Sequence, residues 1–189
     1  MISENDTTRK MVQRYLMLFL NAKRKCIFRQ DFDELTIGDW TIGPFRAGEE
    51  ARLPNWIIEK LVSDDIVDIA PEDALESLRR LQNQYRAEDR HPHKLQSFHP
   101  NLYAALERKM TRLQSDKTSL DPRSFDEIEK MQRMIPSLVE TRLSKIIRVA
   151  KSGAYQDKRE YMTMEERWLC EELAELISSW RTAVREWGA

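Results

Sequence analysis

The 189-residue sequence has little glycine, proline and cysteine, and each scarcity excludes a class of protein. Five Gly and seven Pro are too few for a collagen-like or a disordered composition. The two cysteines, Cys26 and Cys170, form neither a disulfide framework nor a CxxC motif, so we expect reduced thiols in an intracellular protein. No window approaches the roughly 20 apolar residues of a membrane span, and the short apolar run at 15–20 lacks a signal-peptide cleavage pattern.

Recognisable catalytic motifs are also missing. The sequence contains no GxGxxG, GxxxxGK, HExxH or GxSxG pattern. Cys170 has no histidine in its half of the chain to act as a base, because all histidines lie within 91–99. Those histidines would need further ligands, such as Glu88 or Asp89, to bind a metal, and a proline-punctuated surface loop explains them with fewer assumptions. We therefore predict a protein that is not an enzyme, with no catalytic residues, cofactor or metal.

The charge is balanced overall, with a formal net charge of −1, but it is unevenly distributed. Residues 1–30 carry seven Lys/Arg against two Asp/Glu, whereas residues 31–75 carry three against twelve. An acidic segment repels the phosphate backbone of nucleic acids and favours basic partners. Dominant DNA binding through residues 31–75 is therefore not expected, while weak DNA contacts through the basic parts stay open.

Residues 1–72 predict an N-terminal helix followed by a small β-rich domain. Apolar residues recur at helical spacing over 6–24, and the basic residues 23–25 suit the C-terminal end of that helix. Pro54 is expected at the first position of a second, short helix, with Trp56 and Leu61 on one face. Short β-prone segments, punctuated by Gly-containing turns, lie at 26–28, 35–37, 40–42 and 66–69.

Residues 73–189 predict an α-helical domain. Proline followed by two acids at 71–73 predicts a helix start, and a second helix is expected to open at 99–100. Residues 115–123 predict a polar connector. The predicted fold class is therefore mostly α, with a small N-terminal β-rich domain followed by an α-helical bundle.

The last two predicted helices begin with capping boxes. The first box opens at Ser124, and Pro136 is expected to kink or break the helix that follows, which Gly153 would end. The second box opens at Thr163 and starts a helix that runs to about Trp187. Its apolar residues recur at spacings of three and four, the strongest periodic pattern in the chain.

Two features of the helical domain indicate binding. Arg142, Lys145 and Arg148 recur every three residues and could contact a partner or DNA, or could form a solvated face, and both alternatives stay open. The last helix carries three tryptophans, which exceeds what one side of a short bundle normally buries and favours an intersubunit face. Core packing is the alternative. The residues expected at the subunit interface are Leu138, Ile146, Leu169, Leu173, Leu176, Trp180 and Trp187.

Taken in order, several motifs over about residues 26–187 resemble those of GINS complex subunits. A Gly-Pro-Phe turn, a Leu-Pro-x-Trp helix start and a following leucine are similar to the family's β-domain, and an Arg-x-x-Lys-Ile segment is similar to its helical domain. The motif residues are Gly43, Pro44, Leu53, Pro54, Trp56, Leu61, Arg142, Lys145 and Ile146. The order, β-domain first, resembles the archaeal two/three-type subunit, whereas the Arg-x-x-Lys-Ile and Thr-x-Glu-Glu features resemble the other subunit layout.

This resemblance implies a non-catalytic scaffold subunit of a GINS complex in DNA replication. Such a subunit would join a homo- or heterotetramer that bridges and activates the replicative helicase at the fork, in a CMG-type assembly. The implied partners are other GINS subunits, the minichromosome maintenance helicase and a RecJ-like replication protein, with primase or polymerase as further candidates, DNA at most weakly, and no membrane. The implied location is the cytoplasm, associated with the nucleoid, if the protein is archaeal, and the nucleus if it is eukaryotic. The alternative is a DNA-binding regulatory protein that uses the basic helix face.

Overall fold

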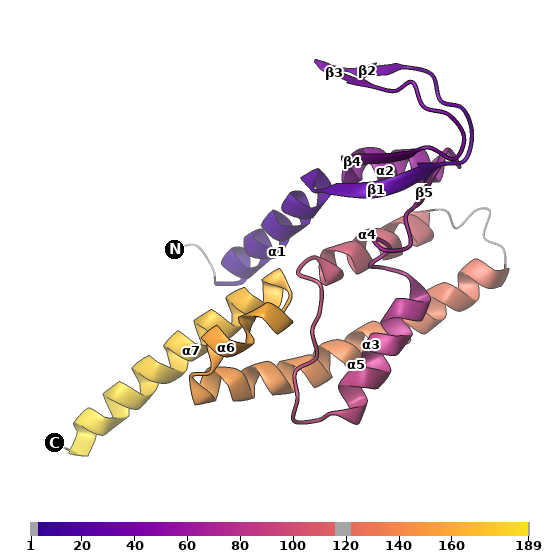
Figure 1. Ribbon diagram of the computed structural model, residues 1–189. Helices are drawn as coiled ribbons and strands as arrows, with labels where there is room; N and C mark the ends of the chain where they lie inside the picture. Colours follow the sequence, from indigo (N-terminus) through magenta and orange to yellow (C-terminus); the bar gives the residue numbers. More distant parts are fainter. Residues whose placement is uncertain (1–3, 116–121, 189) are drawn as a thin grey trace. The chain divides into compact units, whose positions relative to one another are not determined.

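The computed structural model describes residues 4–115 and 122–188 and divides the chain into two compact units, up to residue 74 and from residue 75 on (Figure 1). The sequence placed the boundary between 72 and 73. The fold is mostly helical with a small N-terminal β region, as the sequence predicted. None of the helices in the described part of the chain combines the length and the apolar character needed to span a membrane.

The N-terminal unit contains a three-stranded antiparallel sheet with strand order β4-β1-β5 and a separate hairpin formed by β2 and β3. Alternate residues of β1 are buried, including Cys26 and Phe28, and they pack against Ile58 and Leu61 of the second helix. In chain order the elements are α1 (Glu4–Asn21), β1 (Lys23–Phe28), β2 (Leu35–Ile37), β3 (Trp40–Ile42), β4 (Glu50–Pro54), α2 (Asn55–Ser63) and β5 (Val67–Ile69).

The first helix is shorter than predicted. It ends at Asn21, and the basic residues 23–25, expected at its C-terminus, begin β1 instead. Two long-range contacts account for the difference. The Arg24 guanidinium is buried and donates to Asn55 Oδ1 at 2.9 Å, and the Lys25 backbone N–H donates to Asp73 Oδ2 at 2.7 Å. Partners about 30 and 50 residues away thus override the local preference for helix.

The predicted β-domain motif lies in this unit. The turn is held by Gly43, whose φ of +95° favours glycine and whose position leaves little room for a Cβ, 3.2 Å from the Asp33 carbonyl oxygen. Pro44 follows in a cis peptide bond. Pro54 is the residue before α2 rather than its first helical residue, and it ends β4, a strand that the sequence reading missed. Trp56 is exposed and lies off the buried face of α2, so its predicted position was wrong.

The helical unit is built around one long helix, α5 (Figure 1). Its first part packs with α3 and α4 around a core that includes Leu81, Phe98 and Leu138. Its C-terminal part packs against α7 around a second core that includes Ile146 and Cys170. The elements are α3 (Leu78–Arg90), α4 (Leu102–Ser115), α5 (Pro122–Ser152), α6 (Tyr155–Lys158), the 3₁₀ turn η1 (Arg159–Tyr161), α7 (Met164–Arg185) and the 3₁₀ turn η2 (Glu186–Gly188).

Three predicted helix boundaries differ from the structure. No helix starts at 71–73, because Asp73 accepts the N–H of β1 and α3 begins only at Leu78, where the Ser77 hydroxyl accepts from the Arg80 N–H at 3.3 Å. Helix α5 begins at Pro122, upstream of the predicted box at 124. It also continues through Pro136, so the predicted break is wrong. Buried apolar side chains on both sides of that proline hold the helix together.

Two predicted helix ends are confirmed. Gly153 follows α5 with φ of +72°, a left-handed conformation that glycine adopts without strain. Thr163 caps α7: its hydroxyl accepts from the Glu166 N–H at 3.2 Å, and its own N–H donates to Glu166 Oε2 at 3.0 Å. Residues 116–121 of the predicted connector lie outside the described residues.

Candidate functional site: a buried ion network and an exposed aromatic face

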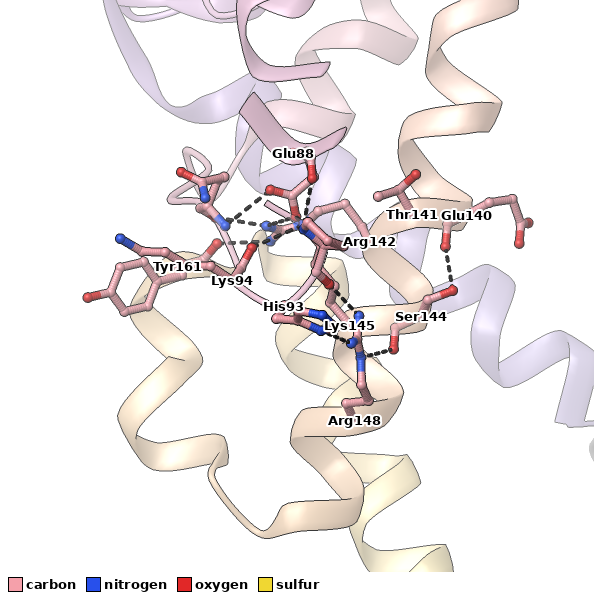
Figure 2. A network of polar contacts seen from close by, with 12 residues as sticks. Glu88, His93, Lys94, Glu140, Thr141, Arg142, Ser144, Lys145, Arg148 and Tyr161 are labelled. Carbon is pink, nitrogen blue, oxygen red and sulfur yellow. Dashed lines mark hydrogen bonds and ion pairs between the residues drawn. The ribbon is translucent and has the colours of Figure 1, made fainter. Parts of the chain in front are cut away.

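Arg142 of α5 is the centre of a buried polar network in the helical unit (Figure 2). Its Nε and Nη2 donate to the two carboxylate oxygens of Glu166, at 2.9 and 2.6 Å. Its Nη1 donates to Glu88 Oε1 at 3.0 Å and to the Gln96 carbonyl oxygen at 2.7 Å. Its Nη2 also donates to the Tyr161 carbonyl oxygen at 2.9 Å. All five guanidinium N–H groups therefore have acceptors.

Lys145, one turn further along α5, completes the network from the other side of Glu88. Its Nζ lies 3.1 Å from Glu88 Oε1 and donates to the backbone carbonyl oxygens of Glu88 at 2.8 Å and of Lys94 at 3.0 Å. The second carboxylate oxygen of Glu88 accepts the Gln96 N–H at 3.1 Å. Helix α3 and the segment that follows it are thus tied to α5 through one ammonium group.

Glu166 has two roles, because it caps α7 and binds Arg142. Its Oε1 also accepts from the Tyr103 hydroxyl at 2.6 Å, which links α4 to the network. Burial and the neighbouring Glu166 carboxylate raise the pKa of Tyr103 well above its usual value, so this phenol stays a hydrogen-bond donor. Burial acts to lower the pKa of Arg142, but the contacts with Glu166 and Glu88 outweigh it and the pKa is raised, so the guanidinium stays charged.

The network is electrically balanced and closed to solvent. Two cations, Arg142 and Lys145, face two carboxylates, Glu88 and Glu166, and at most 4% of any of these side chains is exposed. The Arg142 guanidinium also lies 4.0 Å from the centroid of the Phe98 ring. Because a buried charge without its partner is costly, this set fixes the positions of α3, α5 and α7 relative to one another.

No group of three His, Cys, Asp or Glu side chains within the described ranges is placed to hold a metal ion. Two of the three histidines are engaged through Nδ1: that of His93 lies 3.0 Å from Arg148 Nη1, and that of His99 accepts the Asn101 N–H at 3.1 Å. Cys170, the excluded nucleophile, is buried, and burial raises its pKa to about 11.

The C-terminal half of α7 and the turn η2 that follows it carry exposed apolar side chains. Leu176 and Trp180 of α7 are 66% and 63% exposed, and Trp187 of η2 is 84% exposed. The spacing of four residues places Leu176 and Trp180 on one side of the helix. We call these three residues the aromatic face. Figure 1 shows this end of α7 extending past α5 toward the C-terminus, so the helical unit itself does not cover the face.

The other residues predicted for the subunit interface are less accessible. Leu138 and Ile146 are each 1% exposed, because they lie in the two cores of the helical unit, so their assignment to an intersubunit face needs correction. Leu169 and Leu173 are half-buried, and Leu173 packs against the second core. The accessible part of the predicted interface is therefore the aromatic face.

The basic face proposed on α5 is also corrected. Arg142 and Lys145 are buried in the ion network, so neither the solvated face nor a DNA-binding face can include them, and of the three only Arg148 is exposed. The sequence reading missed Glu88, Glu166 and Tyr103 as the partners of Arg142. One signal was available, because Arg142 continues an apolar stripe on α5 and a cation in such a stripe requires buried acceptors. The family-motif residues Leu53, Leu61, Lys145 and Ile146 are likewise buried.

The helical unit matches the model of a known protein family. Residues 74–185 match the model Sld5, described as the GINS complex protein helical bundle domain. The match spans more than half of the chain and includes both the ion network and all of α7. No curated protein matches the chain.

Proposed function

This chain belongs to the GINS complex protein family, and from that membership we propose that it is a scaffold subunit of a GINS tetramer that bridges and activates the replicative helicase at the fork. The family is a non-catalytic scaffold family, and membership supports a role as a GINS subunit in DNA replication, in partnership with other GINS subunits. We further propose that the complex is a tetramer, that the chain is a subunit of the archaeal type, and that the complex contacts the helicase.

The observation that carries the proposal is the aromatic face of α7. A tryptophan side chain presents about 150–250 Å² of contact surface, so covering Trp180 and Trp187 would remove roughly 300 Å² from water. At about 25 cal/mol per Å² this is worth about 7 kcal/mol before the costs of association. Isolated exposed apolar residues are common, but two tryptophans and a leucine within twelve residues at the end of α7 and in η2 are typical of an interface centre.

A second surface supports the proposed contact with non-GINS partners. Around the hairpin of β2 and β3, Asp31, Asp33, Glu34 and Asp39 are all exposed. An acidic surface of this kind attracts basic partner surfaces and repels DNA. We therefore propose that this acidic surface contacts basic surfaces of the minichromosome maintenance helicase, a RecJ-like protein, and primase or polymerase. We do not expect it to contact DNA. Because the proposed subunit acts at the replication fork, we propose that it is located in the cytoplasm if the protein is archaeal and in the nucleus if it is eukaryotic.

The test replaces part of the aromatic face and measures the mass of the assembly. The double variant Leu176→Asp/Trp180→Asp places charge on the face without touching either core, so the chain should fold. The matched control, Ser178→Asp/Thr182→Asp, adds the same charge at exposed positions on the opposite side of α7. Each would be co-expressed with candidate GINS partners and weighed by native mass spectrometry.

We expect the first variant to leave the complex as a folded monomer, while the control stays in an assembly of wild-type mass. An assembly of wild-type mass with both variants would refute the proposal. A wild-type chain that remains monomeric with every GINS partner would do the same.

A further inference from the structure

A basic pocket opens beside the ion network, and Lys145 is one of the residues that line it. Its volume is about 380 Å³, within the range of about 300–1,000 Å³ that is typical of ligand sites. Three parts of the helical unit line it: the segment 93–95, the C-terminal part of α5, and the region of α6 and η1. Figure 2 shows two of its cationic residues, Lys94 and Arg148, next to Lys145 and His93.

The cations of this pocket lack anionic partners within the part of the chain that the structure describes. Arg148 donates to the carbonyl oxygens of Pro92 and Ser144, at 2.6 and 3.3 Å, and none of the carboxylates in the described ranges lies within ion-pair distance of it. Lys158 lies 5.7 Å from the centroid of the Tyr161 ring, and neither it nor Lys94 has a described acidic partner. Lys94, Arg148 and Lys158 thus line the pocket as three cations without a described acidic partner, beside Lys145, which pairs with Glu88.

The pocket is held open by the network behind it. Lys145 donates to the Lys94 carbonyl oxygen, Arg148 to that of Pro92, and Arg142 to that of Tyr161. The segment 93–95 is therefore held by buried Lys145 and exposed Arg148, and the η1 wall by buried Arg142, before any ligand binds. A preformed site loses less conformational entropy on binding than a mobile one.

The lining favours one class of ligand. Leu95 and Val149 add apolar surface, and Tyr161 adds an aromatic ring, to the three cations. A nucleic-acid site would need a basic track that follows successive phosphates, whereas this is a single confined pocket with an apolar part. A peptide that places a carboxylate next to an apolar side chain fits both features.

We propose that this pocket binds an acidic segment of a partner protein. An Asp or Glu carboxylate would meet Lys94, Arg148 and Lys158, and the neighbouring apolar side chain would lie on Leu95 and Val149. The pocket would add a second docking point to the helical unit, at a site that the aromatic face does not include.

The test is fluorescence anisotropy with the full chain and the labelled peptide Asp-Asp-Leu-Asp-Glu-Phe-Asp. The pocket variant is Lys94→Glu/Lys158→Glu, since the structure gives neither side chain a contact that folding requires. The matched control is Lys151→Glu/Arg185→Glu, which makes the same change in net charge at two exposed positions that do not line the pocket. Circular dichroism checks the fold, and Lys94→Gln/Lys158→Gln replaces the first variant if charge reversal prevents folding.

We expect the pocket variant to bind at least about tenfold more weakly, the control to bind within about twofold of wild type, and added salt to weaken wild-type binding. Equal binding of the peptide with Asn and Gln in place of its acids would overturn the proposal. So would equal loss in both variants, or binding of oligo-dT or inorganic phosphate without binding of the peptide. Peptide binding can be measured whether or not the chain forms an oligomer. A negative result in this experiment therefore does not affect the test of subunit assembly.

Discussion

Replacing Arg142 by methionine perturbs the ion network at its centre. Methionine keeps an unbranched side chain of similar length but removes the charge and all five donors. The carboxylates of Glu88 and Glu166 would then face only Lys145, so the sealed site would carry one uncompensated negative charge. The carbonyl oxygens of Gln96 and Tyr161 would also lose one donor each, and that of Tyr161 would keep the Phe98 N–H at 3.2 Å.

The expected cost follows from this loss. Removing one partner of a buried ion pair destabilises a protein by about 3–5 kcal/mol, because the remaining charge stays buried. The unfolding entropy of the helical unit, residues 75–189, is about 0.24 kcal/mol/K at roughly 2.1 cal/mol/K per residue. The melting temperature of this unit should therefore fall by about 12–20 °C.

The assay is thermal unfolding followed by circular dichroism, with Arg133→Met as the control. Arg133 is also an arginine of α5 but is exposed, with one i,i+4 ion pair to Glu129. Its replacement should cost at most about 0.5 kcal/mol. If Arg142→Met lowers the melting temperature no more than Arg133→Met, the reasoning about the network is wrong.

Three further predictions concern α7 and the thiols. Thr163→Ala should cost about 0.5–2 kcal/mol in urea unfolding, whereas Thr163→Ser, which keeps the hydroxyl acceptor, should cost much less; equal costs would contradict the cap. Burial raises the pKa of Glu165, so its ionised form opposes folding at neutral pH and the penalty disappears as the pH falls below the unfolded pKa. Glu165→Gln should therefore be more favourable to stability at about pH 7 than at about pH 4, and the reverse order would exclude this cause. Burial raises the pKa of Cys26 and of Cys170 to about 11, so both should react with iodoacetamide at mildly basic pH only after unfolding, and rapid labelling of the native chain would contradict their burial.

Features coded by neighbouring residues were predictable from the sequence. The box at Thr163 and Glu166 and the stop at Gly153 each depend on residues a few positions apart, and both are confirmed. The β-prone segments at 35–37 and 40–42 likewise form the hairpin of β2 and β3. In these cases the local pattern and the packed structure favour the same conformation.

Features that depend on distant residues were not predictable in the same way. The basic residues 23–25 suit a helix end, but the pairing of β1 with β4 and β5 draws them into a sheet. The spacing of Arg142 and Lys145 predicts that they share one side of α5, but it does not predict which groups pack against that side. One of those groups, Glu88, lies 54 residues from Arg142 in the sequence. The pocket lined by Lys94 and Lys158 also depends on chain segments that meet only in the fold.

The most direct measurement of the central claim is the solvent exposure of the tryptophans of α7, read by hydroxyl-radical footprinting and mass spectrometry. It would compare the assembled GINS complex with the Leu176→Asp chain, which should not assemble. We expect Trp187 and Trp180 to be strongly protected in the complex and oxidised in the unassembled chain. Trp168, half-buried within its own chain, should change little between the two. Equal oxidation of Trp180 and Trp187 in both samples would contradict the claim that another subunit covers this face.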